Sequence, residues 1–554
     1  MLNECLTGAT VSADYSAPDA TQPQPRTSVF FAVAPVWDLS FQSIGIPALI
    51  AWCREAGYVT ESCDLNIAFN RQFGGNELDA DRIQAAYEAI TSDPVFRDSY
   101  LLRSATEKVR LPLPFGFAEI VCNNYSRLPD FLEDERFNPF IAFARANSFI
   151  DRIAAAPADR PLLVGMGWDG ENQVIATLTI AREIKRRRPD ALVMIGGPWA
   201  TAMSDVLRLE AVLLRDIDFI LPKKAEAPLT ELLQVLDREG GGRPKGLIPG
   251  VMINEGGAFS PYFPNSTPVK AENLPRPALF PLTDYRRENV LPYESERGCY
   301  WGKCKFCHHI LTYTHGHNSK PIAKVIDDLK AYAEEFDYEV AAFVDAAMPP
   351  KRVREIAETF LAEDMNLRWA GFCRAERSFT PEIFEVARRS GLDVLSFGVE
   401  HASKKVLDFI GKPQNPAEMR RVLQDCAEAG IYTTAGVMNG LPSETYEDLD
   451  ELLDFLDTIK DFVYLHPHMF KFERGSEFFR NAERYGLKVL ENHPESRLAI
   501  YHDFEDANGG ETRQFIKETN LNQNWWRENM RRTLDWKSKK TKGFCKAVEF
   551  IVDH

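Results

Sequence analysis

Apolar and polar residues alternate in blocks over the first 250 residues. Short apolar runs are typical of buried parallel strands, and they lie at 27–35, 59–67, 160–170, 191–201 and 217–222. Apolar residues at helical spacing predict helices, and these lie at 44–58, 171–190, 205–216 and 227–239. A mostly helical insertion at about 75–157 interrupts the alternation. This order predicts an α/β domain over 29–250 with a doubly wound, Rossmann-like sheet.

The strand ends of this sheet are the expected ligand edge, because open α/β sheets bind ligands beyond the carboxyl ends of their strands. Glycines at these ends would let a large ligand approach the backbone closely. The expected contacts are Trp37, Asp38, Gly165, Met166, Gly167, Trp168, Gly196 and Gly197.

A second block of alternating elements begins near residue 290. Its strands are expected at 291–297, 339–347, 367–376, 392–400, 431–440 and 462–470. Helices are expected near 320–336, 351–363, 380–390, 403–429 and 446–459. Six β/α units predict a partial (β/α)6 TIM-like barrel, with active residues at the C-terminal strand ends. The barrel is expected over 290–475, after a proline-rich linker at 251–289 and before a mixed C-terminal cap at 476–554.

Charge and hydropathy narrow the class of protein. The chain has 554 residues and a formal net charge of −16, which argues against a nucleic-acid partner because such proteins carry a basic footprint. No apolar run reaches the length of about 18 residues that a spanning helix needs, so no membrane partner is expected. Residues 1–28 are polar and lack a signal-peptide pattern, which predicts a disordered tail. We expect a cytoplasmic monomer whose thiols stay reduced.

Three of the ten cysteines form a cluster, within the stretch "ERGCYWGKCKFCHH". Cys299, Cys304 and Cys307 have the spacing C-x4-C-x2-C and follow the first strand of the predicted barrel. A zinc site could combine these thiolates with His308 or His309. A 4Fe-4S cluster normally takes four thiolates, so three would leave one iron open to a substrate or cofactor. Ordinary loop cysteines are the third interpretation.

The cysteine motif and four later segments together resemble the radical S-adenosylmethionine (SAM) enzymes over about 290–480. The segments are "FVDAAMPP", "GFCRAER", "FGVEHASKKVLDFIGKPQ" and "AGVMNGLPSET". The first cysteine gap is one residue longer than the usual C-x3-C-x2-C. The resemblance implies that the three cysteines are catalytic and hold a 4Fe-4S cluster. It implies that SAM is bound by Phe306, Asp345, Arg374, Glu400, Ser403, Gly436, Gly440 and Pro442.

Several of these residues have a second interpretation. The resemblance places Asp345 near the methionine amino group of SAM, but the same carboxylate could cap the following helix. Arg374 and Glu400 could form an ion pair inside the barrel. His466 and His468 share one face of the last predicted strand; they could reach substrate or form a hydrogen-bonded core pair.

The region 27–240 resembles the cobalamin-binding domain that precedes the radical domain in one large subgroup. The common Gly-Glu-Gly-Glu run of that domain appears here as "KKAE", residues 223–226. All ten histidines lie at position 308 or later. The D-x-H-x-x-G motif that supplies an imidazole below cobalt is therefore impossible in this domain. A domain that has lost cobalamin and serves as a scaffold is the alternative.

The resemblance implies an enzyme that cleaves SAM to a 5′-deoxyadenosyl radical. With cobalamin, it would methylate an unactivated carbon of a peptide or small-molecule natural product. An external electron donor such as flavodoxin or ferredoxin would reduce the cluster. The alternatives are a cobalamin-assisted rearrangement or cyclisation without methyl transfer and, from another class, a zinc-stabilised binding protein.

Overall fold

The computed structural model describes residues 26–73, 121–123, 125–135, 138–265, 269–308, 316–490, 494–506, 511–519 and 521–522. Most of the expected N-terminal tail and of the helical insertion lies outside these residues, as do His309 and residues 523–554 of the expected cap. None of the helices in these ranges is long and apolar enough to cross a membrane.

The N-terminal half forms a six-stranded sheet in the order β2-β1-β3-β4-β5-β6. Its first five strands are parallel, which confirms the expected doubly wound α/β architecture. The strands are β1 (Ser28–Val33), β2 (Thr60–Asp64), β3 (Leu162–Gly167), β4 (Leu192–Gly196), β5 (Phe219–Leu221) and β6 (Met252–Ile253). The helices are α1 (Gly45–Glu55), α2 (Leu65–Phe73), α7 (Leu128–Glu133), α8 (Pro139–Ala146), α9 (Ser148–Ala155), α10 (Val174–Arg187), α11 (Pro198–Ala202), α12 (Ser204–Leu207) and α13 (Glu226–Glu239).

Side-chain alternation along β1 explains why helices cover both faces of this sheet. Val29 and Phe31 pack in one core with apolar residues of α1 and α13, whereas Phe30 and Ala32 pack in another core with α8, α9 and α10. Successive residues of a strand point to opposite faces, so one buried strand supplies both layers.

Four elements of this half differ from the sequence prediction. Helices α2 and α11 begin inside the segments 59–67 and 191–201, which the sequence predicts as strands. The Asp64 side chain accepts the Ile67 amide at 2.9 Å, and Pro198 opens α11, so both helices start earlier than the apolar pattern indicates. Strand β6 pairs antiparallel with β5, inside the segment expected to be a linker; two residues are too short to show a periodicity. The helix predicted at 205–216 is reduced to α12, and the chain continues as turns. Leu209 and Val212 are exposed there, so the apolar residues of this stretch do not share one buried face.

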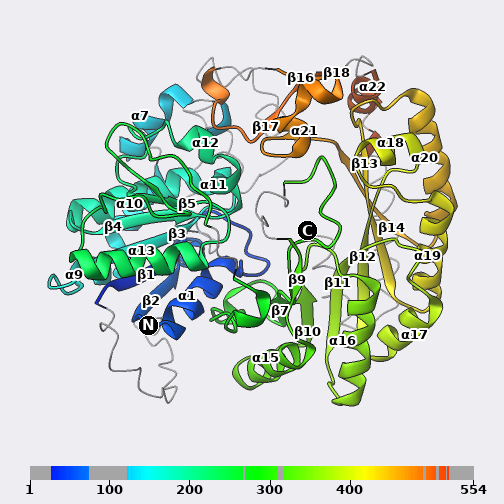
Figure 1. Ribbon diagram of the computed structural model, residues 1–554, viewed down its shortest axis with the longest axis horizontal. Helices are drawn as coiled ribbons and strands as arrows, with labels where there is room; N and C mark the ends of the chain where they lie inside the picture. The colour runs from blue at the N-terminus through cyan, green and yellow to red at the C-terminus, as the bar shows by residue number, and fades with distance from the viewer. Residues whose placement is uncertain are drawn as a thin grey trace.

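The second sheet is all parallel, in the order β14-β13-β12-β11-β10-β7. It confirms the partial (β/α)6 barrel (Figure 1). Its strands are β7 (Val290–Tyr293), β10 (Val340–Phe343), β11 (Arg368–Arg374), β12 (Leu392–Glu400), β13 (Tyr432–Asn439) and β14 (Tyr464–Met469), with the short pair β8 (Glu296–Arg297) and β9 (Asn318–Ser319). Its helices are α15 (Ile322–Glu335), α16 (Pro350–Ala362), α17 (Pro381–Arg389), α18 (Lys404–Phe409), α19 (Pro416–Glu428) and α20 (Tyr446–Ile459).

The two halves share part of their core. Phe41, from the loop after β1, packs against the inner face of the barrel at the starts of its strands, together with Val290, Val340, Ala342, Ala370, Val394, Tyr432 and Tyr464. The neighbouring Gln42 side chain exchanges two hydrogen bonds with the backbone of Phe280, at 2.9 and 2.8 Å. The Tyr285 hydroxyl donates to Asp64 at the end of β2.

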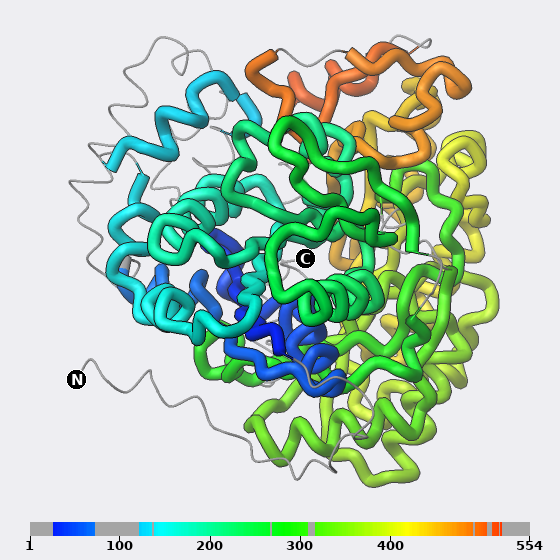
Figure 2. The backbone as a smooth tube through the Cα atoms, turned by 60° about the vertical axis from the view of Figure 1, so that its left-hand side comes forward, coloured from blue at the N-terminus to red at the C-terminus, as the bar shows by residue number. Residues whose placement is uncertain are grey.

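The C-terminal segment lies above both sheets, as the orange part of the chain shows (Figures 1 and 2). Arg474 pairs with Asp205 of the first half at 3.1 Å, and Arg513 donates to the Gly440 carbonyl of the barrel at 2.9 Å. The elements of this segment are β15 (Phe472–Glu473), α21 (Glu477–Arg480), β16 (Leu487–Val489), β17 (Tyr501–His502), β18 (Phe504–Asp506) and α22 (Glu511–Thr519).

Candidate active site

One row of residues crosses four strands on the inner face of the barrel. Strand register aligns Arg374 with Gly398, Gly398 with Gly436, and Gly436 with His466. Neighbouring strands lie about 4.8 Å apart, so the row spans ~14 Å. Tyr432 and Tyr464 belong to the inner cluster, and residues two apart share a face; Gly436 and His466 therefore face the interior as well.

The two glycines of this row leave different amounts of space. A Cβ on Gly398 would lie 2.6 Å from both the Glu400 carboxylate and the Lys412 ammonium, so these tips fill that position. A Cβ on Gly436 would meet nothing nearer than the Phe397 carbonyl oxygen at 4.0 Å. The row therefore has room for a side-chain carbon at Gly436, and this space is called the open strip below.

The charged groups of the site gather at one end of the row. Lys412 donates to Glu400 at 2.6 Å, and Arg374 pairs with Glu376 at 2.9 Å. The Arg374 guanidinium also lies 3.9 Å from the centre of the Trp301 ring. Trp301 belongs to the cysteine loop, between Cys299 and Cys304 in the sequence. The ion pair between Arg374 and Glu400, considered from the sequence, does not form, because each has a different partner.

The other end of the row is neutral. Burial lowers the pKa of His466 to about 4, so its imidazole is uncharged at neutral pH. Within the described part of the chain, His466 Nε2 and the buried Thr434 Oγ1 have no hydrogen-bond partner. A buried polar atom without a partner is costly, and a ligand in the strip could satisfy both atoms. His468 is exposed, so the two histidines do not form a core pair.

The cysteine loop is fastened to the turn that ends α18. The Trp301 indole donates to the Gly411 carbonyl at 2.8 Å. The Lys305 amide donates to the Ile410 carbonyl at 2.9 Å, and the Lys305 ammonium donates to the Phe409 carbonyl at 2.6 Å. Helix α18 begins at Lys404, shortly after β12 ends at Glu400, so the end of the fourth barrel strand positions the loop that carries the cysteines.

The thiols suit iron–sulfur ligation in kind and in setting. Cys299, Cys304 and Cys307 are all half-buried. Burial raises the pKa of Cys304 to about 11, while Lys412 and Arg374 act to lower it; nearby cations favour the thiolate that metals bind. Among the described residues, no three His, Cys, Asp or Glu side chains form a metal-binding group.

Asp345 and Ser403 are buried, and both form hydrogen bonds with other groups of the protein. Asp345 is 2% exposed, and burial raises its pKa to about 7. Its carboxylate accepts from the amides of Ser295 and Glu296 at 2.7 and 2.8 Å. Asp345 thus supports the strand end before the cysteine loop instead of capping the next helix. Ser403 donates its hydroxyl to Asp448 at 2.6 Å. Asp345 and Ser403 are 2% and 1% exposed, so little of either side chain is accessible to SAM.

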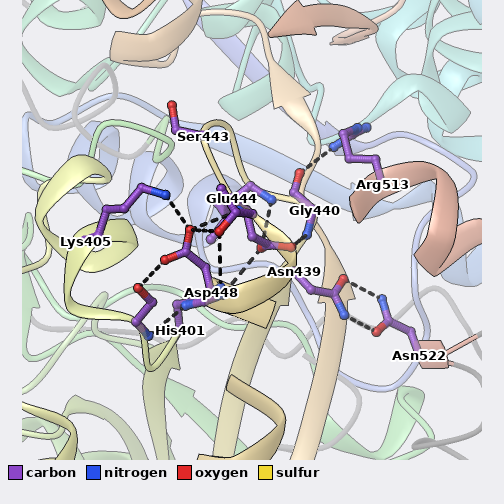
Figure 3. A network of polar contacts seen from close by, with 12 residues as sticks. His401, Lys405, Asn439, Gly440, Ser443, Glu444, Asp448, Arg513 and Asn522 are labelled. Carbon is purple, nitrogen blue, oxygen red and sulfur yellow. Dashed lines mark hydrogen bonds and ion pairs between the residues drawn. The ribbon is translucent and has the colours of Figure 1, made fainter. Parts of the chain in front are cut away.

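The other SAM candidates support the site. Phe306 is half-buried against the outer core of the barrel. Gly440 and the buried Pro442 begin the turn after β13, where the Glu444 carboxylate accepts the Gly440 amide at 3.1 Å. Figure 3 shows how this turn, His401 and Asp448 join one polar network, with Arg513 and Asn522 on its other side.

At the ligand edge of the first sheet, two expected contact side chains lie in the core. Met166 is 2% exposed and Trp168 is 0% exposed. The Trp168 ring packs edge-on against Trp199 at 5.3 Å. A Cβ on Gly197, where φ is +115°, would lie 2.5 Å from the Trp168 carbonyl oxygen. These residues hold the loops of this edge together, and the two side chains are not available for direct ligand contact.

The remaining candidates at this edge divide into two groups. A Cβ on Gly196 would lie 2.9 Å from the Leu221 carbonyl oxygen, so the backbone of the sheet requires this glycine. A Cβ on Gly165 would lie 2.5 Å from the tip of the Met194 side chain, which would have to shift. Trp37 and Gly167 are half-buried and Asp38 is exposed. These three residues retain surface that a ligand can contact.

Comparison with known proteins agrees with this geometry. The model of the radical SAM superfamily matches residues 293–456, which include the three cysteines, Arg374 and Gly436. This region is a radical SAM domain. The match favours the iron–sulfur interpretation of the cysteines over the zinc interpretation. In the iron–sulfur interpretation, three cysteines leave one iron open to a cofactor such as SAM.

Two solved structures share the fold of both halves. A radical S-adenosylmethionine methyltransferase, TsrM, from Kitasatospora setae with cobalamin and a 4Fe-4S cluster bound has a TM-score of 0.56 at 17% identity, covering 84% of this chain and 81% of that chain. OxsB, a cobalamin-dependent S-adenosylmethionine radical enzyme with aqua-cobalamin bound, has a TM-score of 0.60 at 14% identity, covering 90% and 67%. Identities this low establish the fold alone.

Curated relatives match half of this chain. An uncharacterized methyltransferase of Pyrococcus horikoshii is 24% identical over 284 residues, which are 50% of this chain and 60% of the relative. An anaerobic magnesium-protoporphyrin IX monomethyl ester cyclase of Rubrivivax gelatinosus is 24% identical over 290 residues, or 50% of each protein. The chain therefore spans about half to three fifths of the length of these relatives.

Sequence reasoning overlooked two residues around the radical SAM domain. Lys412 lies in the quoted segment "FGVEHASKKVLDFIGKPQ", yet only the tertiary fold shows that it pairs with Glu400. Phe41 gave no signal, because an apolar residue in a loop has no periodicity that predicts its partner.

Proposed function

We propose that the chain is a cobalamin-dependent radical SAM enzyme that methylates a carbon of a peptide or small-molecule natural product. The observation that carries the proposal is the row from Arg374 to His466, with charged groups beside the cysteines, an open strip at Gly436 and neutral groups at the far end. SAM has the same division, with a charged methionine end and a neutral adenine end.

In this proposal, the protein holds and orients its ligands. Cys299, Cys304 and Cys307 would hold the 4Fe-4S cluster, and Arg374 and Glu400 would flank the charged end of SAM. When bound, the cluster supplies the electron that cleaves SAM, and cobalamin supplies the methyl group. An external donor such as flavodoxin or ferredoxin would deliver the electron.

The first half supports the cobalamin part of the proposal through its fold and its ligand edge. The TsrM and OxsB structures that share its fold contain cobalamin, and Trp37, Asp38 and Gly167 keep surface at the corresponding edge. Because this half has no histidine, it offers no imidazole to the lower face of cobalt.

Anaerobic reconstitution followed by assay tests the proposal. We expect absorbance at roughly 400 nm, from charge transfer between iron and sulfur. We also expect 5′-deoxyadenosine to be released from SAM under reducing conditions. The Cys304→Ser variant should lose both signals, whereas the matched Cys63→Ser variant in the first sheet should keep them. If wild-type protein holds no cluster and cleaves no SAM, the proposal is wrong.

A second reaction is favoured by one relative, because the match from Rubrivivax gelatinosus is a cyclase. Rearrangement or ring closure would use the same radical without transferring a methyl group. The mass of the product separates the two reactions, since methylation adds one methyl group and rearrangement adds none.

A further inference from the structure

A buried ion pair joins the first sheet to the start of the cysteine loop. Glu226, the first residue of α13, pairs with Arg297, the last residue of β8, and the two residues are 4% and 6% exposed. Burial alone would raise the pKa of Glu226, but Arg297 outweighs this effect and the pKa is lowered. The pair is therefore charged and shielded from solvent.

This contact comes from the "KKAE" run, which departs from the acidic-glycine pattern of cobalamin-binding domains. Lys224 of the same run lies 3.6 Å from Glu294, beside β8. Glu294 in turn lies 3.4 Å from Arg297. Four charges from two halves of the chain thus meet at one joint.

The joint lies two residues before the first cysteine of the loop. On its barrel side, Asp345 accepts the amides of Ser295 and Glu296. After it, Gly298 has φ of +81°, and a Cβ there would lie 2.4 Å from the Gly316 carbonyl oxygen. Residues 295–298 are therefore held from the barrel by backbone contacts and from the first sheet by Glu226.

We propose that Glu226 is a positioning residue that sets the place of Cys299 through Arg297. The proposal rests on the proposed function, since it concerns the loop that would hold the cluster. Glu226 follows β5 at the carboxyl edge of the first sheet, where ligands of such sheets bind. The pair thereby connects the ligand edge of one half to the cysteine loop of the other.

Thiol alkylation of the full-length apoprotein tests the positioning directly. Removing one member of a buried ion pair leaves the charge of its partner buried without compensation. Glu226→Gln should therefore raise the mobility of the cysteine loop around Arg297. We expect iodoacetamide to modify Cys299 about tenfold faster in this variant, as followed by mass spectrometry, because local opening governs access. Glu239→Gln, the same change at the exposed end of α13, should leave the rate unchanged.

Two buried thiols separate a local effect from unfolding. Cys53 and Cys426 are 0% exposed, one in each half, and should stay protected in every variant. An unchanged Cys299 rate, or an equal rise at Cys53 and Cys426, would overturn the proposal. Arg297→Lys should also speed Cys299 modification, and the double variant should show less than the sum of the two effects, as residues in contact do.

The reconstituted protein gives a second readout. We expect the electron paramagnetic resonance spectrum of the reduced cluster with SAM to change in Glu226→Gln and to stay constant in Glu239→Gln. An identical spectrum in both variants contradicts the positioning role. If wild-type protein binds no cluster, the proposed function fails, while the alkylation experiment still decides the role of Glu226.

Discussion

Single residues divide the inner face of the barrel by charge. Arg374, Glu400 and Lys412 stand at the cysteine end, each with a protein partner, and His466 stands neutral at the other end. Because the charged groups already have partners, their cost of burial is offset before any ligand binds. The space at Gly436 is then the feature that admits a ligand between the two ends.

Filling that space should block SAM without harming the fold. Gly436→Val adds a side chain whose Cβ meets nothing nearer than 4.0 Å, so we expect an unchanged Tm. We expect SAM to bind at least about tenfold more weakly, a loss of roughly 1.4 kcal/mol, as measured by calorimetry on reconstituted protein. Gly257→Val is the control. That glycine also has open space around it, but it lies in the bend after β6, in the first half of the chain. Wild-type affinity in Gly436→Val would place SAM elsewhere.

His466 should make the apoprotein sensitive to mild acid. Its pKa is about 4 in the folded protein against an ordinary value of 6.5, so the unfolded chain binds more protons between these values. Stability therefore falls as pH falls through this window, by about 2 kcal/mol between pH 7 and pH 5. His466→Gln removes this contribution, and its Tm should drop less over the same pH step.

The matched control for this measurement lies two residues away. His468 is exposed on the same strand, although partial burial lowers its pKa as well. His468→Gln should therefore keep the part of the acid sensitivity that His466 contributes. Equal acid sensitivity of wild type and His466→Gln would show that this imidazole titrates normally in the folded protein.

At the scale of elements, helix α22 clamps the end of the barrel. Arg513 donates to the carbonyls of Gly440 and Phe470, both at 2.9 Å. Asn522 and the buried Asn439 exchange two amide hydrogen bonds at 2.6 and 3.1 Å (Figure 3). The C-terminal segment therefore fixes the turn after β13 that borders the open strip.

Loss of the Arg513 clamp should release both elements. Arg513→Gln removes two charge-assisted hydrogen bonds, each of which contributes about 1.5–3 kcal/mol. We expect amides of residues 511–519 and 440–444 to exchange hydrogen at least about tenfold faster, while amides of β10 keep their protection. Lys517→Gln on the exposed face of the same helix should change neither segment. Unaltered exchange at 440–444 in Arg513→Gln would mean that α22 does not hold the turn.

At the scale of the whole molecule, the two halves are not independent. Phe41 of the first half fills the inner core of the barrel, and Glu226 meets Arg297 across the joint. Phe41 follows β1 and Glu226 begins the helix after β5, so both contacts lie at the carboxyl edge of the first sheet. The edge that would bind cobalamin is therefore also the edge that contacts the barrel.

Truncating Phe41 should destabilise the whole molecule. Phe41→Ala leaves a cavity between the halves, and such changes cost about 3–5 kcal/mol. We expect a lower Tm in scanning calorimetry, with both halves unfolding at the lower temperature. Phe263→Ala, at a residue that is 45% exposed, should leave the Tm within about 1 °C, as surface changes do. A transition in which only the first half melts earlier would show that Phe41 does not couple the halves.

The sequence alone determined the main elements of the fold and the resemblance to the radical SAM enzymes. Hydrophobic periodicity placed nearly all the strands and helices of both sheets, because the burial pattern is local in sequence. Motif spacing indicated the cysteine loop, Gly436 of β13 and Gly440 in the turn after it. Strand β6 escaped it, since two residues carry too little signal. The helix predicted at 205–216 is reduced to α12, because its apolar residues do not share one buried face.

Only the tertiary structure decided which residues meet. It paired Lys412 with Glu400 and Arg374 with Glu376, tied Asp345 and Ser403 into the protein's own hydrogen bonds, and buried Trp168 in the core. Such contacts join positions far apart in the chain, and their energies depend on distance and burial, which no local pattern encodes. Sequence motifs therefore indicated the expected cofactors. Packing decided which of the candidate side chains remain accessible to contact them.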